Sequence, residues 1–305
     1  MTTARLVREE APVAAPPVTC RLLCERVQIG SGESFLIALR VDVPPSARVS
    51  WENPGAAGRA LHAELSAPKG FQVSPALFPA PSVFTDEAGE RSFGYETRTM
   101  LFFRVEAPAE LAQGTRVEFK ARLDWSTVGA QASAGQAEER LELATYPARD
   151  TGPREGSSEI AHFAARLPQP FAELQGAAHE WSRTWEDTGE GAGFRLDVLV
   201  VDASELDFYP LAANGLDWAG SSTQARGKNR ELQLDFVSDP SVEATREARG
   251  VVRTVRNGVE QFWLLRTSCA LPSVERAPAP KKPLKKQRDP RPRETGTDRG
   301  TERRN

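Results

Sequence analysis

The sequence contains little cysteine and histidine, with three residues of each in 305. Three cysteines are too few for a disulfide framework. The histidines His62, His162 and His179 are isolated, and no cluster of His, Cys and Asp has the spacing of a zinc site. We therefore expect no metal and no cofactor.

Long apolar runs are also missing. No stretch of 18 or more apolar residues occurs, so no transmembrane segment is predicted. The given N-terminus, residues 1–10, has no apolar core of the kind that defines a signal peptide. The G-x-S-x-G, P-loop and G-x-G-x-x-G motifs are absent, which leaves no motif for a common hydrolase or nucleotide site.

Charge is distributed unevenly along the chain. Residues 276–305 contain eleven Lys and Arg against four Asp and Glu, a net charge of +7, so the rest of the chain carries −10 within a total of −3. An acidic body argues against specific nucleic-acid binding by the folded part. The basic run 281–286 is interpreted as a solvated tail, with non-specific contact to anionic lipid or nucleic acid as the alternative.

Short runs of β-forming residues, separated by Pro and Gly, recur through most of the chain and predict strands. Residues 116–125 alternate apolar and polar side chains, with Val117, Phe119, Ala121, Leu123 and Trp125 on one face. Asn257-Gly258 between two such runs predicts a β-hairpin. The fold class is therefore all-β, with two immunoglobulin-like β-sandwich domains and disordered N- and C-terminal segments.

Composition also predicts the domain boundaries. We expect a flexible leader (1–17), a first β-sandwich (18–146), a linker (147–158), a second β-sandwich (159–272) and a disordered basic tail (273–305). A short helix capped by Ser158 is expected at the start of the second domain. Trp181 and Trp185, four residues apart, are expected on a short helix or loop packed onto that domain, with an exposed ligand-binding pair as the alternative.

Three motifs in register resemble the N-terminal module of the DsbD thiol:disulfide interchange family, including its longer ScsB-like members. They are Trp51-Glu-Asn-Pro-Gly55-Ala-Ala-Gly58, Gly70-Phe71 followed by Phe78-Pro79-Ala80-Pro81, and Phe93-Gly94-Tyr95-Glu96. The second half resembles the second β-domain of the ScsB-like members more weakly. The resemblance implies a periplasmic module that passes electrons from a membrane-embedded partner to substrate proteins.

The family performs this transfer with a cysteine pair in the pattern W-x-x-C-x-x-x-C. Here the matching stretch begins at Trp125, and the two cysteine positions are occupied by Val128 and Ala132. Neither side chain can form a thiolate, so neither can attack a disulfide. The family's W-H-x-Y is also replaced, by residues 47–50. No catalytic residue is therefore assigned.

The candidate binding residues that remain are the motif positions Trp51, Asn53, Pro54, Tyr95 and Trp125. For Trp51, Asn53 and Trp125, a structural role is the favoured interpretation. Trp51 and Trp125 are expected to pack in the core, and Asn53 is expected to cap the turn that Pro54 and Gly55 form. A binding loop beside the former redox site is the alternative for the Asn53–Gly55 turn.

The cysteines that are present lie elsewhere, at Cys20, Cys24 and Cys269. Cys20 and Cys24 are four residues apart in a predicted strand, which separates them by about 13 Å, too far for a disulfide. We interpret them as unpaired thiols on one strand face. A bond between either of them and Cys269 is the alternative.

Three functional hypotheses follow. The first is a non-catalytic DsbD-type module that binds a protein partner, such as a redox or membrane electron-transfer protein, in an extracytoplasmic system. The second is an active thiol oxidoreductase that uses Cys20, Cys24 or Cys269. The third is a carbohydrate- or surface-binding β-sandwich built on Trp181 and Trp185. The resemblance implies a periplasmic location, whereas the given N-terminus shows no signal peptide.

Overall fold

The computed structural model describes residues 18–129, 132–146, 157–185, 192–212, 215–238 and 246–269. The predicted leader (1–17) and tail (273–305), and all but two residues of the predicted linker (147–158), lie outside the described residues. Within the described part, strands dominate and one α-helix is present, so the prediction of an all-β fold is confirmed. One compact unit contains both groups of sheets, while the predicted domain boundaries stay a prediction.

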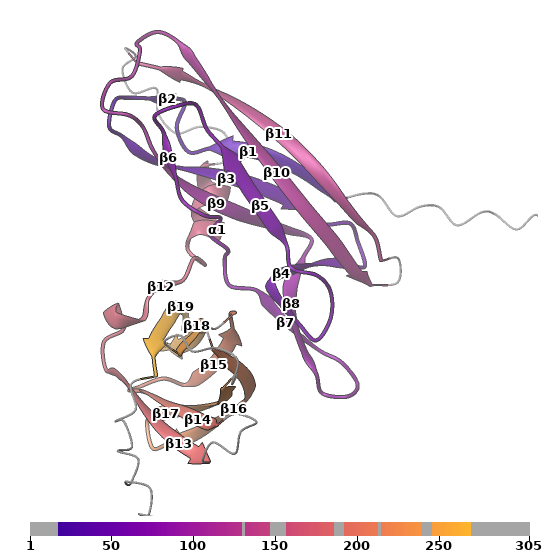
Figure 1. Cartoon of the computed structure of the whole chain (residues 1–305), viewed down its shortest axis with the longest axis vertical. Coiled ribbons are helices and arrows are strands. Elements are labelled where there is room, and N and C mark those ends of the chain that lie inside the picture. Colours follow the sequence, from indigo (N-terminus) through magenta and orange to yellow (C-terminus); the bar gives the residue numbers. More distant parts are fainter. Residues whose placement is uncertain are drawn as a thin grey trace, which may run out of the picture. The chain divides into compact units, whose positions relative to one another are not determined.

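The first sandwich consists of a four-stranded and a seven-stranded sheet (Figure 1). The smaller sheet has the order β1 (Thr19–Cys24), β3 (Ser34–Asp42), β9 (Arg98–Glu106), β6 (Gln72–Val73). The larger sheet has the order β2 (Gln28–Ile29), β11 (Ala134–Thr145), β10 (Arg116–Gly129), β4 (Ala47–Gly55), β8 (Arg91–Glu96), β7 (Ser82–Thr85), and β5 (His62–Ser66) also pairs with β10.

The alternating pattern of residues 116–125 determines how β10 faces the core. Phe119, Ala121 and Leu123 are buried, and the side chains between them point outward. Phe119 receives the edges of the Phe35 and Phe71 rings at centroid distances of 6.1 and 5.3 Å. One face of β10 therefore belongs to the core and the other stays polar, as the period of two requires.

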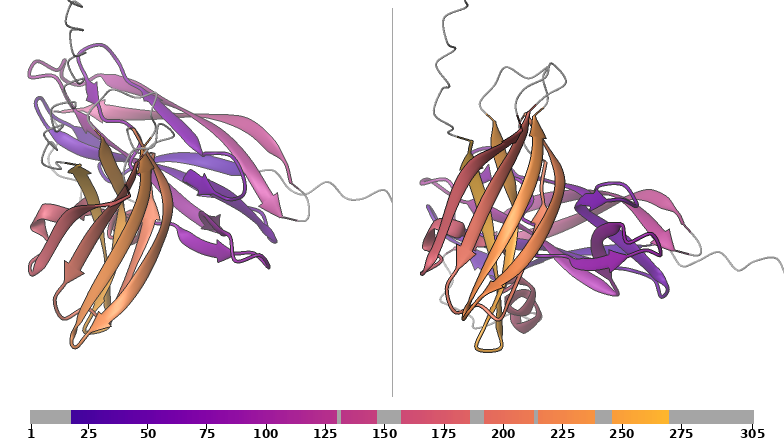
Figure 2. Two further views of the ribbon diagram at one scale, coloured as in Figure 1. Left: turned by 60° about the horizontal axis from the view of Figure 1, so that its bottom comes forward. Right: turned by 90° about the horizontal axis from the view of Figure 1, so that it is seen from below.

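The second sandwich has two four-stranded sheets (Figure 2). One has the order β12 (Gln169–Pro170), β19 (Val259–Ser268), β18 (Glu247–Arg256), β15 (Glu205–Pro210). The other has the order β13 (Ala177–Trp185), β14 (Gly193–Val200), β17 (Asn229–Ser238), β16 (Leu216–Arg226), and the short 3-10 helix η1 (Phe171–Glu173) precedes β13. Asn257 and Gly258 both have positive φ, 50° and 76°, and form the predicted turn between β18 and β19.

Helix α1 (Ser157–Ala164) begins inside the predicted linker, so Ser158 lies within the helix and is not its N-cap. The helix packs on the first sandwich. Its Ile160 is buried against Ala38, Met100 and Phe102. Arg98 of β9 also forms a 2.7 Å ion pair with Glu159. The packing surface of this helix is therefore provided by strands that lie far upstream in the sequence.

The prediction of a helix or loop at Trp181 and Trp185 is wrong, because both residues belong to strand β13. Side chains four residues apart share a face in a helix and in a strand, so their spacing did not distinguish the two. The Trp181 ring packs against Phe236 at a centroid distance of 5.7 Å. Its indole N–H donates to Thr267 Oγ1 at 3.4 Å.

Trp51 is among the largest side chains with no exposed surface. We expect Trp51→Ala to lower the free energy of unfolding by about 3–5 kcal/mol, because it removes a large buried ring and leaves a cavity. Urea unfolding of both proteins measures this. Trp218→Ala, at a half-buried tryptophan of β16, is the matched control and should cost less; an equal cost would contradict the central role of Trp51.

Candidate functional site

Strands β10 and β11 form a hairpin (Figure 1), and the resemblance assigns the family's two cysteine positions to Val128 and Ala132 at its end. Opposed residues in this ladder have numbers that add to 260, as in Ser126 and Ala134. Thr127 N–H donates to Ser133 O at 2.7 Å, and Thr145 N–H donates to Thr115 O at 2.9 Å. Odd-numbered residues of β10 therefore direct their backbone hydrogen bonds to β11, and even-numbered residues direct theirs to the other side.

The paired strands end at Ser126 and Ala134, and the hydrogen bond from Thr127 N–H to Ser133 O continues their register by one residue. Continued one residue further, the register would place Val128 opposite Ala132, at a non-hydrogen-bonded position where opposed Cα atoms are about 4.5 Å apart. A disulfide requires Cα atoms about 4.4–6.8 Å apart. The continued register would therefore suit a cross-strand cysteine pair at these two positions, which carry no thiol.

Side chains brace this end of the hairpin. Ser133 N–H donates to Thr127 Oγ1 at 2.9 Å, and the two hydroxyl groups lie 3.0 Å apart. Thr127 is buried. The opposed strands are therefore held together by side chains next to the Val128–Ala132 position.

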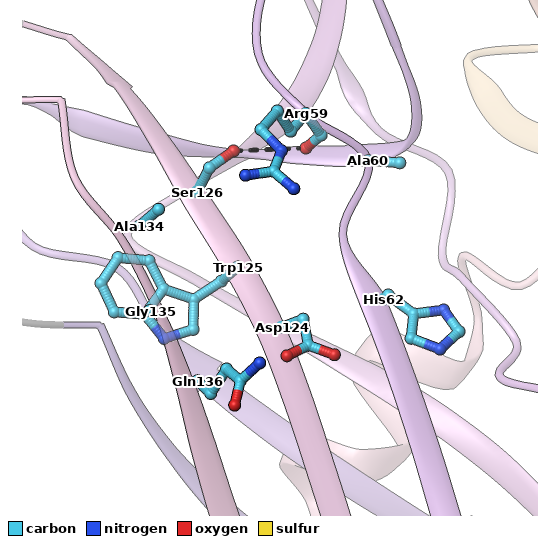
Figure 3. A pocket seen from close by; sticks show the side chains of 9 residues that line it. All are labelled: Arg59, Ala60, His62, Asp124, Trp125, Ser126, Ala134, Gly135 and Gln136. Carbon is cyan, nitrogen blue, oxygen red and sulfur yellow. Dashed lines mark hydrogen bonds between the residues drawn. The ribbon is translucent and has the colours of Figure 1, made fainter.

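The loop that follows the Trp-x-Asn-Pro-Gly motif covers Val128. Gly58 has a φ of +101°, and a Cβ on it would collide with Ser50 Oγ and approach Val128 Cγ2 to 3.0 Å. Ser126 Oγ donates to Arg59 O at 3.4 Å and attaches the loop to β10 (Figure 3). Glycine is required at position 58 because the loop lies so close to the strand.

A hollow of about 550 Å³ lies beside this loop, over β5, β10 and β11 (Figure 3). Its polar lining includes one row across the three strands, because His62 and Gln136 both oppose Asp124. The residues that define the hollow are Arg59, His62, Asp124, Trp125, Ser126 and Gln136. It therefore presents a cation, a carboxylate, an amide and an indole within one concave surface.

Trp125 lies across the neighbouring strand at Gly135, where a Cβ would come within 2.7 Å of the indole ring. The residue is only 9% exposed, in agreement with the predicted core position, and it also lines the hollow. Its Nε1 is buried and has no hydrogen-bond partner in the part of the chain that the structure describes. A ligand that reaches this atom would find an unsatisfied donor.

The other candidate residues of the first sandwich lie away from the hollow and contact the second sandwich or the core. Asn53 Nδ2 donates to Pro210 O at 2.7 Å, and Asn53 Oδ1 accepts from Gly55 N–H at 3.1 Å, the predicted turn cap. Trp51 meets the Tyr209 ring edge-on at 6.5 Å. Pro54 is half-buried in β4.

Tyr95 is also a structural residue, because it is buried and donates to Pro79 O at 2.6 Å. Burial, together with the nearby Glu52 carboxylate, raises the pKa of its hydroxyl well above the usual value. The phenol therefore stays neutral and serves as a hydrogen-bond donor. Of the five sequence candidates, only Trp125 lines the hollow.

Arg59, His62 and Gln136 line the hollow but were not candidates from the sequence. Two of them belong to strands whose pairing with β10 brings them together. The one available signal was the position of Arg59, directly after the glycine that ends the W-x-N-P-G-x-x-G motif. A single sequence contains no comparable pattern that predicts which residues become neighbours across paired strands.

The cysteines lie in three different surroundings. Cys24 is buried in the core of the first sandwich, and Cys269 packs against the core of the second. Cys20 is half-buried on the same strand as Cys24 and opposes Val41 of β3. Burial, with a smaller effect of Glu139, raises the pKa of the Cys20 thiol to about 11.

Neither a metal site nor a membrane-spanning helix is found in the described part of the chain. Over the described ranges, no group of three or more His, Cys, Asp and Glu residues is placed to hold a metal ion. None of the helices in the described part of the chain has the length and apolar character needed to cross a membrane.

Comparison with solved structures gives a match with an informative TM-score. The N-terminal periplasmic domain of ScsB from Proteus mirabilis is 17% identical, with a TM-score of 0.53 over 83% of this chain and 92% of that chain. The chain therefore has a DsbD-like fold. At this identity the likeness shows the fold alone.

Further matches have TM-scores too low to indicate a shared fold. A chain named BspA_C_WT is 6% identical over 81% of this chain and 99% of that chain, with a TM-score of 0.19. The C-terminal domain of the Streptococcus pyogenes antigen I/II-family protein AspA is 7% identical over 82% and 99% of the two chains, with a TM-score of 0.14. No protein-family model and no curated protein matches the chain.

The hairpin geometry can be tested with cysteines. We expect the double variant Val128→Cys with Ala132→Cys to form an intramolecular disulfide in air, because the β10–β11 register, continued beyond its last pair, opposes the two positions. Thiol titration and intact-protein mass measure the bond. Val128→Cys with Gln136→Cys is the matched control and should keep both thiols, because these residues are not opposed. Failure of the Val128→Cys, Ala132→Cys variant to form a disulfide would contradict the register.

Glu52 makes stability depend on pH. Burial raises the pKa of this carboxyl to about 7, and the Arg249 guanidinium opposes part of the rise. Between about pH 4.5 and 7 the folded protein keeps a proton that the unfolded chain releases, so stability should fall as pH rises through this window. Because part of the residue is exposed, the fall should be smaller than full burial would give.

The measurement is urea unfolding of the wild type and Glu52→Gln at several pH values from 4.5 to 7.5. The variant should gain stability relative to the wild type as pH rises. Glu64→Gln, at an exposed carboxylate of β5, corrects for the removal of one surface charge. Parallel pH profiles for the wild type and Glu52→Gln would contradict the shifted pKa.

Proposed function

We propose that this chain is a non-catalytic relative of the DsbD N-terminal module that binds a protein partner in an extracytoplasmic thiol-disulfide or assembly system. The observation that carries the proposal is the β10–β11 register, which, continued two residues beyond its last pair, opposes Val128 and Ala132, the positions that the resemblance assigns to the cysteine pair. The DsbD-like fold supports the family. Since that relative is a periplasmic domain, an extracytoplasmic location is part of the proposal.

Disulfide exchange begins with attack by a thiolate. Neither hairpin position can provide one, so electron transfer at this site is ruled out by the side chains themselves. Cys20 and Cys24 are no substitute as a pair, because four residues of one strand separate them by about 13 Å. With its pKa raised to about 11, Cys20 exists almost entirely as the thiol at neutral pH.

The hollow beside the hairpin is the proposed partner site. Trp125 gives it an apolar base with a buried donor that lacks a partner among the described residues. Arg59, Asp124 and Gln136 surround this base with groups that can pair with a polypeptide backbone or a charged side chain. An aromatic anchor within a polar rim is the usual composition of a protein-binding hot spot.

Carbohydrate binding through Trp181 is less well supported. One face of its ring packs against Phe236, and its N–H donates to Thr267. Both interactions hold the indole against the second sandwich rather than leaving it available as a stacking platform.

A photo-crosslinking amino acid at Gln136, beside the hollow, tests the proposal in cells of the native host. The matched control places it at Arg140, on the exposed face of the same strand but outside the hollow. We expect an adduct specific to position 136, and mass spectrometry should identify in it a protein of an extracytoplasmic thiol-disulfide or assembly system. Trp125→Ala should reduce the adduct several-fold.

Two results would overturn the proposal. One is identical adducts from positions 136 and 140. The other is reduction of a disulfide substrate by the wild-type protein, together with a thiol titration that shows a stable disulfide between its own cysteines. That result would establish an oxidoreductase that uses Cys20, Cys24 or Cys269.

A further inference from the structure

A second concave surface lies at an open edge of the first sandwich. A cavity of about 670 Å³ runs between strand β5 of the larger sheet and residues 73–78 beside β9 of the smaller sheet. Its lining includes the buried apolar side chains of Leu61, Phe78 and Phe103. β5 pairs only with β10 among the described strands, so its other edge faces this groove.

The hydrogen-bond alternation of β10 determines which β5 backbone groups face the groove. Even-numbered residues of β10 bond toward β5, and they oppose His62, Glu64 and Ser66. The N–H and C=O groups of Ala63 and Leu65 therefore point away from β10. In the described part of the chain, no hydrogen bond outside the β5–β10 ladder satisfies them.

The rim of the groove is acidic. Glu52 and Glu64 line it, and no Lys or Arg does among the described residues. An unpaired strand edge above an apolar floor recruits an extended segment through main-chain hydrogen bonds, while alternate side chains enter the floor. The Glu64 carboxylate favours basic side chains at the positions that point away from the floor.

We propose that the free edge of β5 binds an extended peptide segment of a partner protein by strand addition, a segment in which apolar residues alternate with Lys or Arg. This surface shares Ala60 and His62 with the lining of the hairpin hollow. The proposal concerns the free edge of β5, so it goes beyond the proposed function and does not depend on it. A second copy of the chain is a poorer occupant, because pairing of β5 with β5 in full register would place Glu64 opposite Glu64, and opposed like charges destabilise a strand pair.

The probe is a fluorescein-labelled peptide, Ser-Lys-Val-Arg-Val-Lys-Ser, titrated with the full chain and followed by fluorescence polarisation. Its control has the same sequence with N-methyl groups on the backbone nitrogens of alternate residues, in both possible phases. N-methylation removes the donors of the added strand but keeps every charge. We expect the methylated peptide that loses the pairing donors to bind at least about tenfold more weakly.

Two variants test the protein side. Ala63→Pro removes a backbone N–H that does not bond β10, and proline is tolerated on a strand edge that faces solvent, so the fold should survive while peptide affinity falls at least about fivefold. Glu64→Lys should weaken binding through charge, whereas Glu138→Lys should not. Glu138 is the matched control because it opposes the same Arg122 from β11 and does not line the groove.

Equal affinity for the methylated and unmethylated peptides would overturn the proposal, and so would equal effects of Glu64→Lys and Glu138→Lys. A wild-type dimer that Ala63→Pro dissociates in sedimentation would assign the edge to a second copy instead. If Ala63→Pro fails to fold, the methylated peptides decide the question alone. The crosslink at position 136 tests the hairpin hollow and the methylated peptides test the β5 edge, so failure of one proposal leaves the other intact.

Discussion

The alternation of backbone hydrogen bonds along strand β10 is the constraint on which both proposed surfaces depend. Odd-numbered residues bond β11, and the same register continued beyond Ser126 opposes Val128 and Ala132. Even-numbered residues bond toward β5 and β4, which directs the amides of Ala63 and Leu65 into the groove. One strand with an uninterrupted register therefore fixes the geometry of a thiol-free hairpin and of an open sheet edge.

The motifs that carry the family resemblance serve packing more than ligand binding in this chain. Asn53 caps its own turn and also donates to Pro210 of the second sandwich. Phe93 and Trp51 both contact the Tyr209 ring. Trp51, Asn53 and Phe93 thus each take part in a contact whose loss would leave a partner exposed or without its hydrogen bond.

The ionisable groups of Tyr95 and Cys20 are neutral, whereas the charged groups of Arg59 and Glu64 are exposed and available to a partner. Tyr95 and Cys20 are held in their neutral forms by burial, which suits packing and hydrogen donation and suppresses nucleophilic chemistry. The charged groups that line the hollow and the groove, such as Arg59 and Glu64, are exposed. The proposed recognition through backbone edges and charge fits this distribution.

The sequence alone determined the all-β class, the buried face of β10, the turn at Asn257-Gly258 and the absence of thiols at positions 128 and 132, because alternation, turn preference and residue identity are local properties. Only the tertiary structure placed His62, Asp124 and Gln136 in one row, packed α1 on the first sandwich and put Trp181 in a strand. Alternating apolar and polar residues predict a strand but do not show which strand pairs with it. Two residues four positions apart lie on one face in a helix and in a strand, so this spacing does not distinguish the two. The pairing partners, and with them both surfaces, follow from contacts between residues far apart in the chain.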